Sequence, residues 1–496
     1  MYLGIDLGTS ELKLVLLAES QRVEASARVP LVVSRPQPLW SEQAPADWWR
    51  ALEQAMALLA ESHPRALRAV RGIGLSGQMH GAVLLDEHDT VLRPAILWND
   101  GRSGAQCEAL MRDVPELTQI TGNLAMPGFT APKLQWVREH EPDVYTRTAR
   151  VLLPKDYLRL QLTGEAISDM SDASGTLWLD VGMRDWSDRM LAATGLTRSH
   201  MPALVEGSSP GGRLRAELAR RWGLPGDVVV AGGGGDNAAS AVGIGAVEPG
   251  QGFVSLGTSG VIFVASDAFR PNPASAMHAF CHALPARWHQ MSVMLSAASA
   301  VDWAARLTGV GNAAALVERA AGLDAAQRAR APIFLPYLSG ERTPHNNPAA
   351  QGVLFGLTHE HDAAAIGWAA LEGVSFGLLD GLHSLALPTP PTRLALVGGG
   401  ARSAWWGDLL ASTLGLELEV REGNEAGGAL GAARLGWLAA GGALAEVCRA
   451  STAPARVHSP QPELTGLLRE RHARFRALYQ TLAPRFWARA GSSPRP

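Results

Sequence analysis

The chain has 496 residues, of which 47% are hydrophobic and 18% are charged, and this composition is that of a folded protein and excludes an intrinsically disordered one. This length exceeds what one hydrophobic core usually organises, so we expect two lobes with a cleft between them. The net charge of −3 provides no broad basic surface, which disfavours nucleic acid and anionic membranes as partners and favours small molecules.

Cysteine usage and the N-terminal pattern bear on the compartment. Cys107, Cys281 and Cys448 are widely spaced, which suits a reducing compartment and argues against a disulfide framework or a thiolate metal site. The chain opens directly on a strand pattern, and its most apolar stretches contain charges such as Glu372 and Asp380, so neither a signal peptide nor a membrane span is indicated. We expect a cytoplasmic protein. The sequence allows a homodimer but does not decide the oligomeric state.

The first predicted element is a β-hairpin in YLGIDLGTSELKLVLL, where Gly8, Thr9 and Ser10 separate two apolar runs. Asp6 lies inside the first run, where a carboxylate costs free energy unless it has a partner. It is therefore either a Mg²⁺ ligand or a satisfied core aspartate. Lys13 is one of only three lysines, and it follows the turn closely enough to reach a phosphate bound there.

A helix and a buried strand are predicted next. Asp47 is placed to cap a helix whose apolar positions share one face, namely Trp48, Leu52, Ala55 and Leu59. RGIGLSG then reads as a strand that runs into SGQMHG, where Gln78 and His80 suit sugar hydroxyls, although a lone histidine is more often structural. Alternation of strands and helices predicts layered α/β lobes.

The stretch AGGGGDNAAS follows another apolar run. Four glycines allow backbone or substrate to approach closely, and Asp236 then begins a helical segment. Asp236 suits a helix N-cap, and it equally suits the carboxylate that accepts a hydroxyl proton in phosphoryl transfer; both roles are compatible. Asn237 is placed to hold a neighbouring hydroxyl. We expect the lobes to divide near residue 243, giving 1–243 and 244–496.

A second hairpin is predicted in QGFVSLGTSGVIFV. The tetrapeptide LGTS therefore occurs at 7–10 and again at 256–259, which indicates either a duplicated lobe or a chance recurrence. Glycine and hydroxyl groups in two facing turns, including Gly257 and Thr258, could clamp a triphosphate; alternatively both are ordinary hairpin turns. LALVGGGARSAWW repeats a strand, a glycine turn at Gly399 and Gly400, and a helix that ends near Gly415.

Other chemistries have weaker support. The chain has neither a GxxxxGK[ST] phosphate loop nor a GxGxxG fingerprint, which disfavours P-loop and Rossmann folds. His278 and His282 have i, i+4 spacing, but no third ligand is evident, so a metal site there is disfavoured.

Taken in order, GIDLGTS, SGQMHG, LWNDGR, GFTAPKLQWVREH, LLPKDYLRL, GGGGDNA, SLGTSG, FLPYLSGERTPHNNP and VGGGARS resemble the FGGY family of carbohydrate kinases over almost the whole chain. The stretch with Lys133 and Trp136 resembles the family's first signature, and GVLFGLTHEHDAAAIGWAALEG resembles its second. The resemblance implies two ribonuclease H-like lobes of the actin/hexokinase superfamily with a catalytic cleft between them. It also implies that the first lobe binds sugar and the second binds ATP.

The resemblance further implies transfer of the ATP γ-phosphate to O5 of D-xylulose. It makes Asp236 the proton acceptor and Asp6 the carboxylate near Mg²⁺, while Met79 and His80 form the sugar pocket with Asp236 and Asn237. The phosphate-facing and adenosine turns are then Gly8, Thr9, Ser10, Gly257, Thr258, Gly399 and Gly400. Relatives commonly carry a polar residue where Ala365 stands, and some carry Asn where Ala404 stands, so adenine contacts are not transferred.

Three other functions are weighed. A kinase of another ketose or of a polyol, such as ribulose or glycerol, would use the same mechanism. An actin-like ATPase without sugar kinase activity would bind ATP without sugar-stimulated ADP release, and fold alone does not exclude it. An NAD-dependent oxidoreductase is weakest, because its fingerprint is missing.

Overall fold

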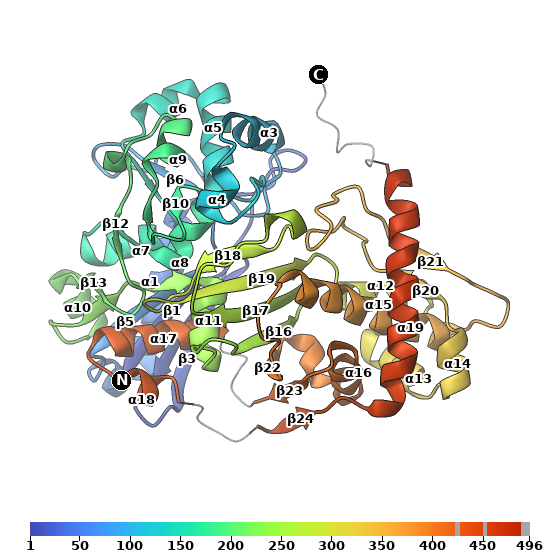
Figure 1. Cartoon of the computed structure of the whole chain (residues 1–496). Coiled ribbons are helices and arrows are strands. Elements are labelled where there is room, and N and C mark those ends of the chain that lie inside the picture. The colour runs from blue at the N-terminus through green and yellow to red at the C-terminus, as the bar shows by residue number, and fades with distance from the viewer. Residues whose placement is uncertain (422–426, 450–453, 488–496) are drawn as a thin grey trace.

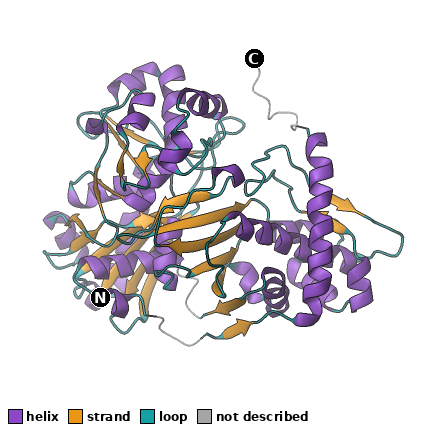
Figure 2. Ribbon diagram, viewed as in Figure 1, coloured by secondary structure: helices purple, strands orange, loops and turns teal. Residues whose placement is uncertain are grey.

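The computed structural model describes residues 1–421, 427–449 and 454–487, which form two lobes, each containing a seven-stranded β-sheet. In Figure 1 the first lobe, blue to green, lies mainly on the left, and the second lobe, yellow to red, lies mainly on the right. Figure 2 shows helices packed around the sheets of both lobes. This is the layered α/β architecture predicted from the sequence.

The first sheet has the strand order β13-β14-β5-β1-β2-β3, and β15 also pairs with β5. Strand β2 is antiparallel to both of its neighbours, β1 and β3, whereas β5 is parallel to β1 and β14 is parallel to β5. The strands are β1 (Tyr2–Leu7), β2 (Glu11–Leu17), β3 (Val23–Pro30), β5 (Gly72–Gly77), β13 (Pro210–Arg213), β14 (Val229–Ala231) and β15 (Gly234–Gly235).

The second sheet has the order β18-β19-β17-β16-β22-β23-β24. Strands β19, β17 and β16 are antiparallel neighbours, and β22 and β23 continue the sheet in parallel. The strands are β16 (Gly252–Leu256), β17 (Gly260–Ser266), β18 (His278–Cys281), β19 (Trp288–Met294), β22 (Arg393–Val397), β23 (Glu417–Val420) and β24 (Arg456–His458).

The two sheets share one topology. The run β3-β2-β1-β5-β14 in the first corresponds to β19-β17-β16-β22-β23 in the second, with three antiparallel strands followed by two parallel ones. Each LGTS tetrapeptide lies at the turn between the first two strands of its lobe. The predicted duplication is therefore confirmed, and so are the two ribonuclease H-like lobes that the family resemblance implied.

The remaining elements complete the lobes. Short strands are β4 (Glu42–Gln43), β6 (Val83–Leu85), β7 (Ala95–Ile96), β8 (Arg150–Leu152), β9 (Ile167–Asp169), β10 (Leu179–Asp180), β11 (Asp185–Trp186), β12 (Ala203–Val205), β20 (Ile333–Leu335) and β21 (Val353–Phe355). Helices before residue 245 are α1 (Pro45–Ser62), α2 (Pro64–Leu67), α3 (Gly104–Asp113), α4 (Leu117–Thr121), α5 (Thr130–His140), α6 (Pro142–Arg147), α7 (Pro154–Thr163), α8 (Met170–Ala173), α9 (Asp188–Ala193), α10 (Ala216–Trp222) and α11 (Asp236–Ile244). Later helices are α12 (Ala298–Leu307), α13 (Ala313–Ala321), α14 (Ala325–Arg330), α15 (Ala363–Ser384), α16 (Ala404–Leu414), α17 (Gly427–Ala439), α18 (Leu444–Val447) and α19 (Pro462–Leu482).

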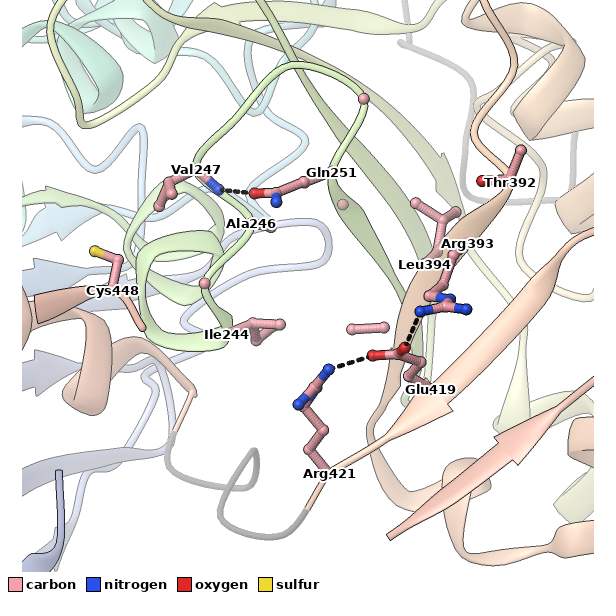
Figure 3. A pocket seen from close by; sticks show the side chains of 14 residues that line it. Ile244, Ala246, Val247, Gln251, Thr392, Arg393, Leu394, Glu419, Arg421 and Cys448 are labelled. Atoms are coloured by element: carbon pink, nitrogen blue, oxygen red, sulfur yellow. Dashed lines mark hydrogen bonds and ion pairs between the residues drawn. The ribbon is translucent and has the colours of Figure 1, made fainter. Parts of the chain in front are cut away.

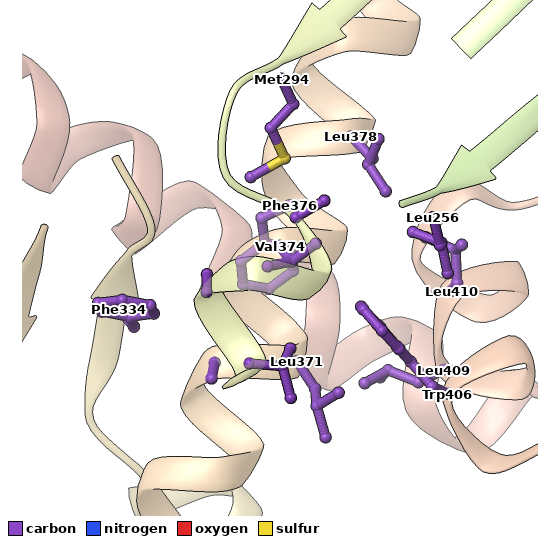
Figure 4. Packing of buried hydrophobic residues seen from close by; sticks show 14 of the residues in the cluster. Leu256, Met294, Phe334, Leu371, Val374, Phe376, Leu378, Trp406, Leu409 and Leu410 are labelled. Atoms are coloured by element: carbon purple, nitrogen blue, oxygen red, sulfur yellow. The ribbon is translucent and has the colours of Figure 1, made fainter. Parts of the chain in front are cut away.

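Helix α15 forms the centre of the second lobe's core. Figure 4 shows Leu371, Val374 and Phe376 on this helix among side chains from the sheet and from α16. By length and composition α15 could cross a membrane, with a mean hydropathy of 1.2, but 89% of its apolar window is buried inside the protein. Such burial is typical of the core helix of a globular domain.

Helix α17 comes late in the chain but packs against the first sheet, beside α11 (Figure 1). Glycines permit this close approach: a Cβ atom added at Gly4 would lie 1.9 Å from the Ala429 carbonyl oxygen, and one added at Gly74 would lie 1.8 Å from that of Ala432. The expected division into 1–243 and 244–496 stays a prediction. The placement of α17 shows that the later segment contributes a helix to the first lobe.

Two local predictions have opposite outcomes. Helix α16 ends at Gly415, which adopts the left-handed conformation at the C-terminal cap, as predicted. The prediction that Asp47 caps a helix is wrong, because α1 begins at Pro45 and Asp47 lies in its first turn. Proline is favoured at the start of a helix, since its missing N–H would have no partner there.

Candidate active site

The glycine run 232–235 connects β14 to α11 and delivers Asp236 to the carboxyl edge of the first sheet. Gly233 has a φ of +79°, and a Cβ atom there would lie 2.5 Å from the Leu75 carbonyl oxygen. A Cβ atom at Gly235 would lie 2.8 Å from the sulfur of Met79. The glycines are therefore needed because the loop runs against β5 and against the SGQMHG segment.

Asp236 is the first residue of α11, and Gly235 occupies the N-cap position. The Asp236 side chain does not cap the helix; its Oδ1 accepts hydrogen bonds from the backbone nitrogen and the side-chain amide of Asn237, at 2.7 and 2.9 Å. Among the described residues, none donates a hydrogen bond to the second carboxylate oxygen of Asp236. Burial, together with the nearby charge of Asp6, raises the pKa of Asp236 to about 6.

Met79 and His80 follow the end of β5, whose Gly77 pairs with Gly235, the residue before Asp236. His80 is held in the left-handed region with a φ of 70°, and its Nδ1 lies 2.7 Å from the Gly175 carbonyl oxygen. Since a carbonyl only accepts, Nδ1 carries the proton and Nε2 is left as an acceptor. Burial lowers the pKa of His80 to about 3, so the ring is neutral at pH 7.

The first-signature helix α5 supports the backbone of His80. Lys133 is fully buried and donates from Nζ to the carbonyls of His80 and Gly128 at 2.9 and 2.7 Å, and Thr130 donates to the same His80 carbonyl at 3.1 Å. The sequence placed Lys133 within a motif but gave it no role of its own. The signal that could have singled it out is the rarity of lysine, of which the sequence has only three.

Asp6 lies between the buried residues Ile5 and Leu7 of β1, and its Cα pairs with that of Lys13 across the hairpin. Burial raises the pKa of Asp6, whereas the nearby Ser76 hydroxyl and the charge of Lys13 oppose this rise. Helix α17 passes directly over this carboxylate, because a Cβ atom at Gly428 would lie 2.8 Å from both Asp6 Oδ1 and Ser76 Oγ. The structure thus places two carboxylates, Asp6 and Asp236, close enough to perturb each other.

The carboxylates of Asp6 and Asp236 suit a Mg²⁺ ion bound together with phosphates better than a metal ion held by protein ligands alone. Mg²⁺ takes oxygen ligands and in phosphoryl-transfer sites needs only one or two carboxylates besides phosphates and water. Asp6 and Asp236 supply such oxygens, and the charge of one raises the pKa of the other, a repulsion that a divalent cation would relieve. Over the described residues, no cluster of three or more His, Cys, Asp or Glu side chains could hold a metal unaided.

The first LGTS turn is held by side chains. The Thr9 hydroxyl donates to Gln78 Oε1 and accepts from Trp98 Nε1, both at 2.9 Å, while Gln43 donates to the Thr9 carbonyl at 2.8 Å. The Gln78 amide in turn donates to Gln43 at 2.9 Å. Gln78 therefore braces the turn, whereas the sequence had suggested a sugar contact, and Trp98 was not assigned a role.

The second LGTS turn borders a cavity of about 630 Å³ in the second lobe. This cavity brings together all four residues predicted for the triphosphate and adenosine of this lobe, Gly257, Thr258, Gly399 and Gly400. Trp406 and residues of α12 and α13 supply apolar walls, and Ser403 and Arg402 supply polar groups. Such a lining is typical of a small-molecule site.

A separate cavity of about 570 Å³ lies where the chain passes from α11 to β16, at the end of α11 opposite Asp236 (Figure 3). In Figure 3 the Glu419 carboxylate lies between the guanidinium groups of Arg393 and Arg421, at 2.9 and 2.5 Å. None of the predicted site residues lines this cavity. The predicted residues instead form two sets, one on the first sheet around Asp236 and Asp6, and one around the cavity of the second lobe.

Comparisons with known proteins agree with this geometry. Residues 1–243 match the N-terminal domain of the FGGY family of carbohydrate kinases, and residues 252–440 match its C-terminal domain. A xylulose kinase of Escherichia coli is 54% identical over 98% of this chain and 99% of its own length, and one of Klebsiella pneumoniae is 57% identical over 88% and 90%. A crystal structure of a xyloylose kinase from Brucella ovis, 51% identical, superimposes with a TM-score of 0.94 over 97% of this chain and 99% of its own. By sequence along its length, by domain order and by fold, the chain belongs to the FGGY family of carbohydrate kinases.

Proposed function

We propose that this carbohydrate kinase transfers the γ-phosphate of ATP to O5 of D-xylulose. The observation that carries the proposal is the convergence of Met79, His80 and Asp236 at one edge of the first sheet, in a chain 54% and 57% identical to proteins named xylulose kinases. Ribulose or glycerol as acceptor would use the same groups, and the experiment below separates these substrates.

Asp236 accepts the O5 proton. The two hydrogen bonds from Asn237 fix Oδ1, which leaves the other oxygen to face the sugar hydroxyl. A pKa of about 6 leaves the carboxylate ionised at pH 7 and makes it a stronger base than an ordinary aspartate. Its position at the start of a helix keeps it rigid, and in phosphoryl transfer positioning of the nucleophile supplies much of the rate.

His80 orients the sugar. Its neutral ring donates from Nδ1 to Gly175 and accepts at Nε2, so it selects a substrate that offers a hydroxyl donor at that point. Lys133 and Thr130 hold the His80 carbonyl and so maintain its left-handed backbone conformation. The oxygen of the Asn237 amide remains available for a second hydroxyl.

The nucleotide lies in the second-lobe cavity, with its phosphates directed at the LGTS turns. Thr258 and Gly257 line the phosphate end, and Gly399 and Gly400 line the adenosine end. Asp6 would hold Mg²⁺, which when bound neutralises charge on the phosphates. Closure of the lobes would exclude water, which otherwise competes with the sugar as acceptor.

The proposal is tested by ADP release from Mg·ATP with D-xylulose, D-ribulose, L-ribulose, glycerol or no acceptor. Wild type should be stimulated most by D-xylulose, and Asp236→Ala should lose turnover by a factor of ~10²–10⁴ while ATP binding persists. Asp227→Ala, which removes an exposed carboxylate of the same lobe, is the matched control. Preference for another acceptor would change the substrate, and acceptor-independent ADP release in all three proteins would indicate an actin-like ATPase.

A further inference from the structure

Five charged side chains lie fully buried behind the loop that carries Asp236, and the proposed reaction does not use them. They come from α7 and from β9 and α8, and we refer to them as the buried charge cluster: Lys155, Asp156, Arg159, Asp169 and Asp172. Lys155 Nζ lies 2.5, 2.8 and 3.2 Å from carboxylate oxygens of Asp156, Asp169 and Asp172, respectively. Burying ions is costly even when they are paired, so a cluster of this size calls for an explanation beyond stability.

Arg159 connects the cluster to the first half of the loop. Its guanidinium donates to the carbonyls of Ala231, the residue before the glycine run, and of Gly232, the first residue of the run. A loop without side chains can be fixed only through its backbone, and two parallel N–H donors from one planar group fix two successive carbonyls. The three carboxylates keep this guanidinium charged, because their fields oppose the lowering of its pKa by burial.

Ser171 connects the cluster to the second half. The backbone nitrogen of Gly235, the residue before Asp236, donates to Ser171 Oγ at 3.1 Å. Ser171 Oγ donates in turn to Asp169, whose other oxygen lies 2.8 Å from Lys155. An unbroken chain of contacts therefore runs from the buried lysine to the residue that precedes the proposed base.

We propose that Arg159 and Ser171 are positioning residues, through which the buried charge cluster sets the location of the Asp236 carboxylate relative to the sugar hydroxyl. This inference rests on the proposed function and assigns a role to residues outside the substrate pocket. A loop held at both ends keeps Asp236 rigid, and errors of about 1 Å in such a group cost on the order of 10²-fold in rate.

Ser168 provides a matched control for Ser171. Both serines are fully buried, and each donates to a cluster carboxylate: Ser168 to Asp156 at 2.6 Å, and Ser171 to Asp169. Only Ser171 also contacts the loop, through Gly235. Substituting each by alanine therefore removes a comparable hydrogen bond from the cluster, but only Ser171→Ala releases the residue before Asp236.

The experiment measures kcat and KM for wild type, Ser171→Ala, Ser168→Ala and Arg159→Lys with Mg·ATP and D-xylulose. We expect kcat to fall at least tenfold in Ser171→Ala and Arg159→Lys with KM for ATP within about twofold of wild type, and to fall less than threefold in Ser168→Ala. Ser171→Thr, which retains the hydroxyl, should recover part of the lost kcat. The acid limb of the kcat profile should move to lower pH in Ser171→Ala, because a looser loop exposes Asp236 to water.

Two outcomes overturn the inference. Equal kcat losses in the two alanine variants would show that the cluster acts only on stability. A rise in KM for ATP with kcat unchanged would show that Ser171 acts on the nucleotide. If wild type shows no acceptor-dependent turnover, the proposed function fails instead, so the two failures are distinguishable. Thermal unfolding of each variant identifies any that does not fold. If Ser171→Ala does not fold, the kcat of Arg159→Lys decides whether the inference holds.

Discussion

The two LGTS hairpins have the same tetrapeptide and the same place in their sheets, but different chemistry. By their pairing across each hairpin, Asp6 corresponds to Ser255, and Lys13 corresponds to Val261. The pairing also differs: Leu7 pairs with Leu12 in the first hairpin, whereas Leu256 pairs with Gly260 in the second, so the first loop is one residue longer. Duplication supplied the scaffold twice, and the charged groups are present only in the first copy.

The supports of the two turns differ as well. Side chains from β4, from the end of β5 and from the Trp98 loop brace the first, through Thr9. Backbone nitrogens at the start of α12 brace the second: those of Ala297 and Ala298 donate to the carbonyls of Thr258 and Gly257 at 2.9 and 3.0 Å. The Thr258 side chain is exposed and borders the cavity. The first turn is therefore built into the first lobe's polar network, and the second is open to a ligand.

The largest expected effect comes from making the first hairpin resemble the second at its acidic position. Asp6→Ser should lower turnover by a factor of ~10²–10⁴ and raise the Mg²⁺ concentration needed for half-maximal rate, because the proposed metal ligand is lost. Steady-state rates over a Mg²⁺ titration provide the measurement. Asp6→Asn is the control for packing, and Ser255→Ala is the control for the equivalent position in the second hairpin. A similar loss of turnover in Ser255→Ala would mean that the two hairpins are functionally alike.

A smaller effect is expected at the basic position. Lys13→Val copies the residue of the second hairpin and removes a charge near the proposed phosphates, so KM for Mg·ATP should rise roughly tenfold with the fold intact. Arg28→Val is the control, since Arg28 pairs with Lys13 on the neighbouring strand but is exposed. Equal changes in both variants would mean that only the lobe's overall charge matters.

The raised pKa of Asp236 predicts a pH-dependent cost in stability. A folded pKa of about 6 lies above the ordinary aspartate value, so ionisation in the folded state is disfavoured, and the cost grows between about pH 4 and pH 6 and is complete above. Asp236→Asn should stabilise the protein by ~1–2 kcal/mol at pH 7.5, allowing for solvent screening, and by almost nothing at pH 4. Denaturant unfolding at the two pH values measures this, and a pH-independent difference would contradict it.

The smallest effects separate the two threonines. Thr9→Ala removes hydrogen bonds to Gln78 and Trp98 and should cost ~1 kcal/mol of stability, whereas Thr258→Ala should leave stability within about 0.5 kcal/mol and weaken ATP binding a few-fold. Urea unfolding and ATP titration of both variants test the contrast. Comparable stability losses would show that the second turn is braced by its side chain too.

The sequence predicted local features well. Both hairpins, the buried strand before SGQMHG and the helix that starts at Asp236 follow from apolar runs and glycine punctuation, which are encoded within a few residues. Gly257, Thr258, Gly399 and Gly400, which the resemblance implied for the nucleotide, also line one cavity, and their role there stays a prediction.

Long-range features were not predictable in this way. Gly4 and Gly74 carry no sign in the sequence that a late helix packs on the first sheet, because the reason for each glycine is a partner hundreds of residues away. The hydrogen bonds from Arg159 to the glycine loop, and from Gln78 to Thr9, likewise depend on tertiary packing. A pattern identifies the residue types available, whereas the fold decides which groups meet.

The most direct test of the central claim follows phosphate onto one carbon of the sugar. Mg·ATP and D-xylulose labelled with ¹³C at C5 are incubated with wild type and with Asp236→Asn, and ¹³C–³¹P coupling is recorded by NMR. We expect coupling at C5 to appear with wild type and to be slower by a factor of ~10²–10⁴ with the variant. Free phosphate without coupling, or coupling that forms equally fast with Asp236→Asn, would contradict the assignment of this chain as a kinase of the D-xylulose O5 hydroxyl with Asp236 as its base.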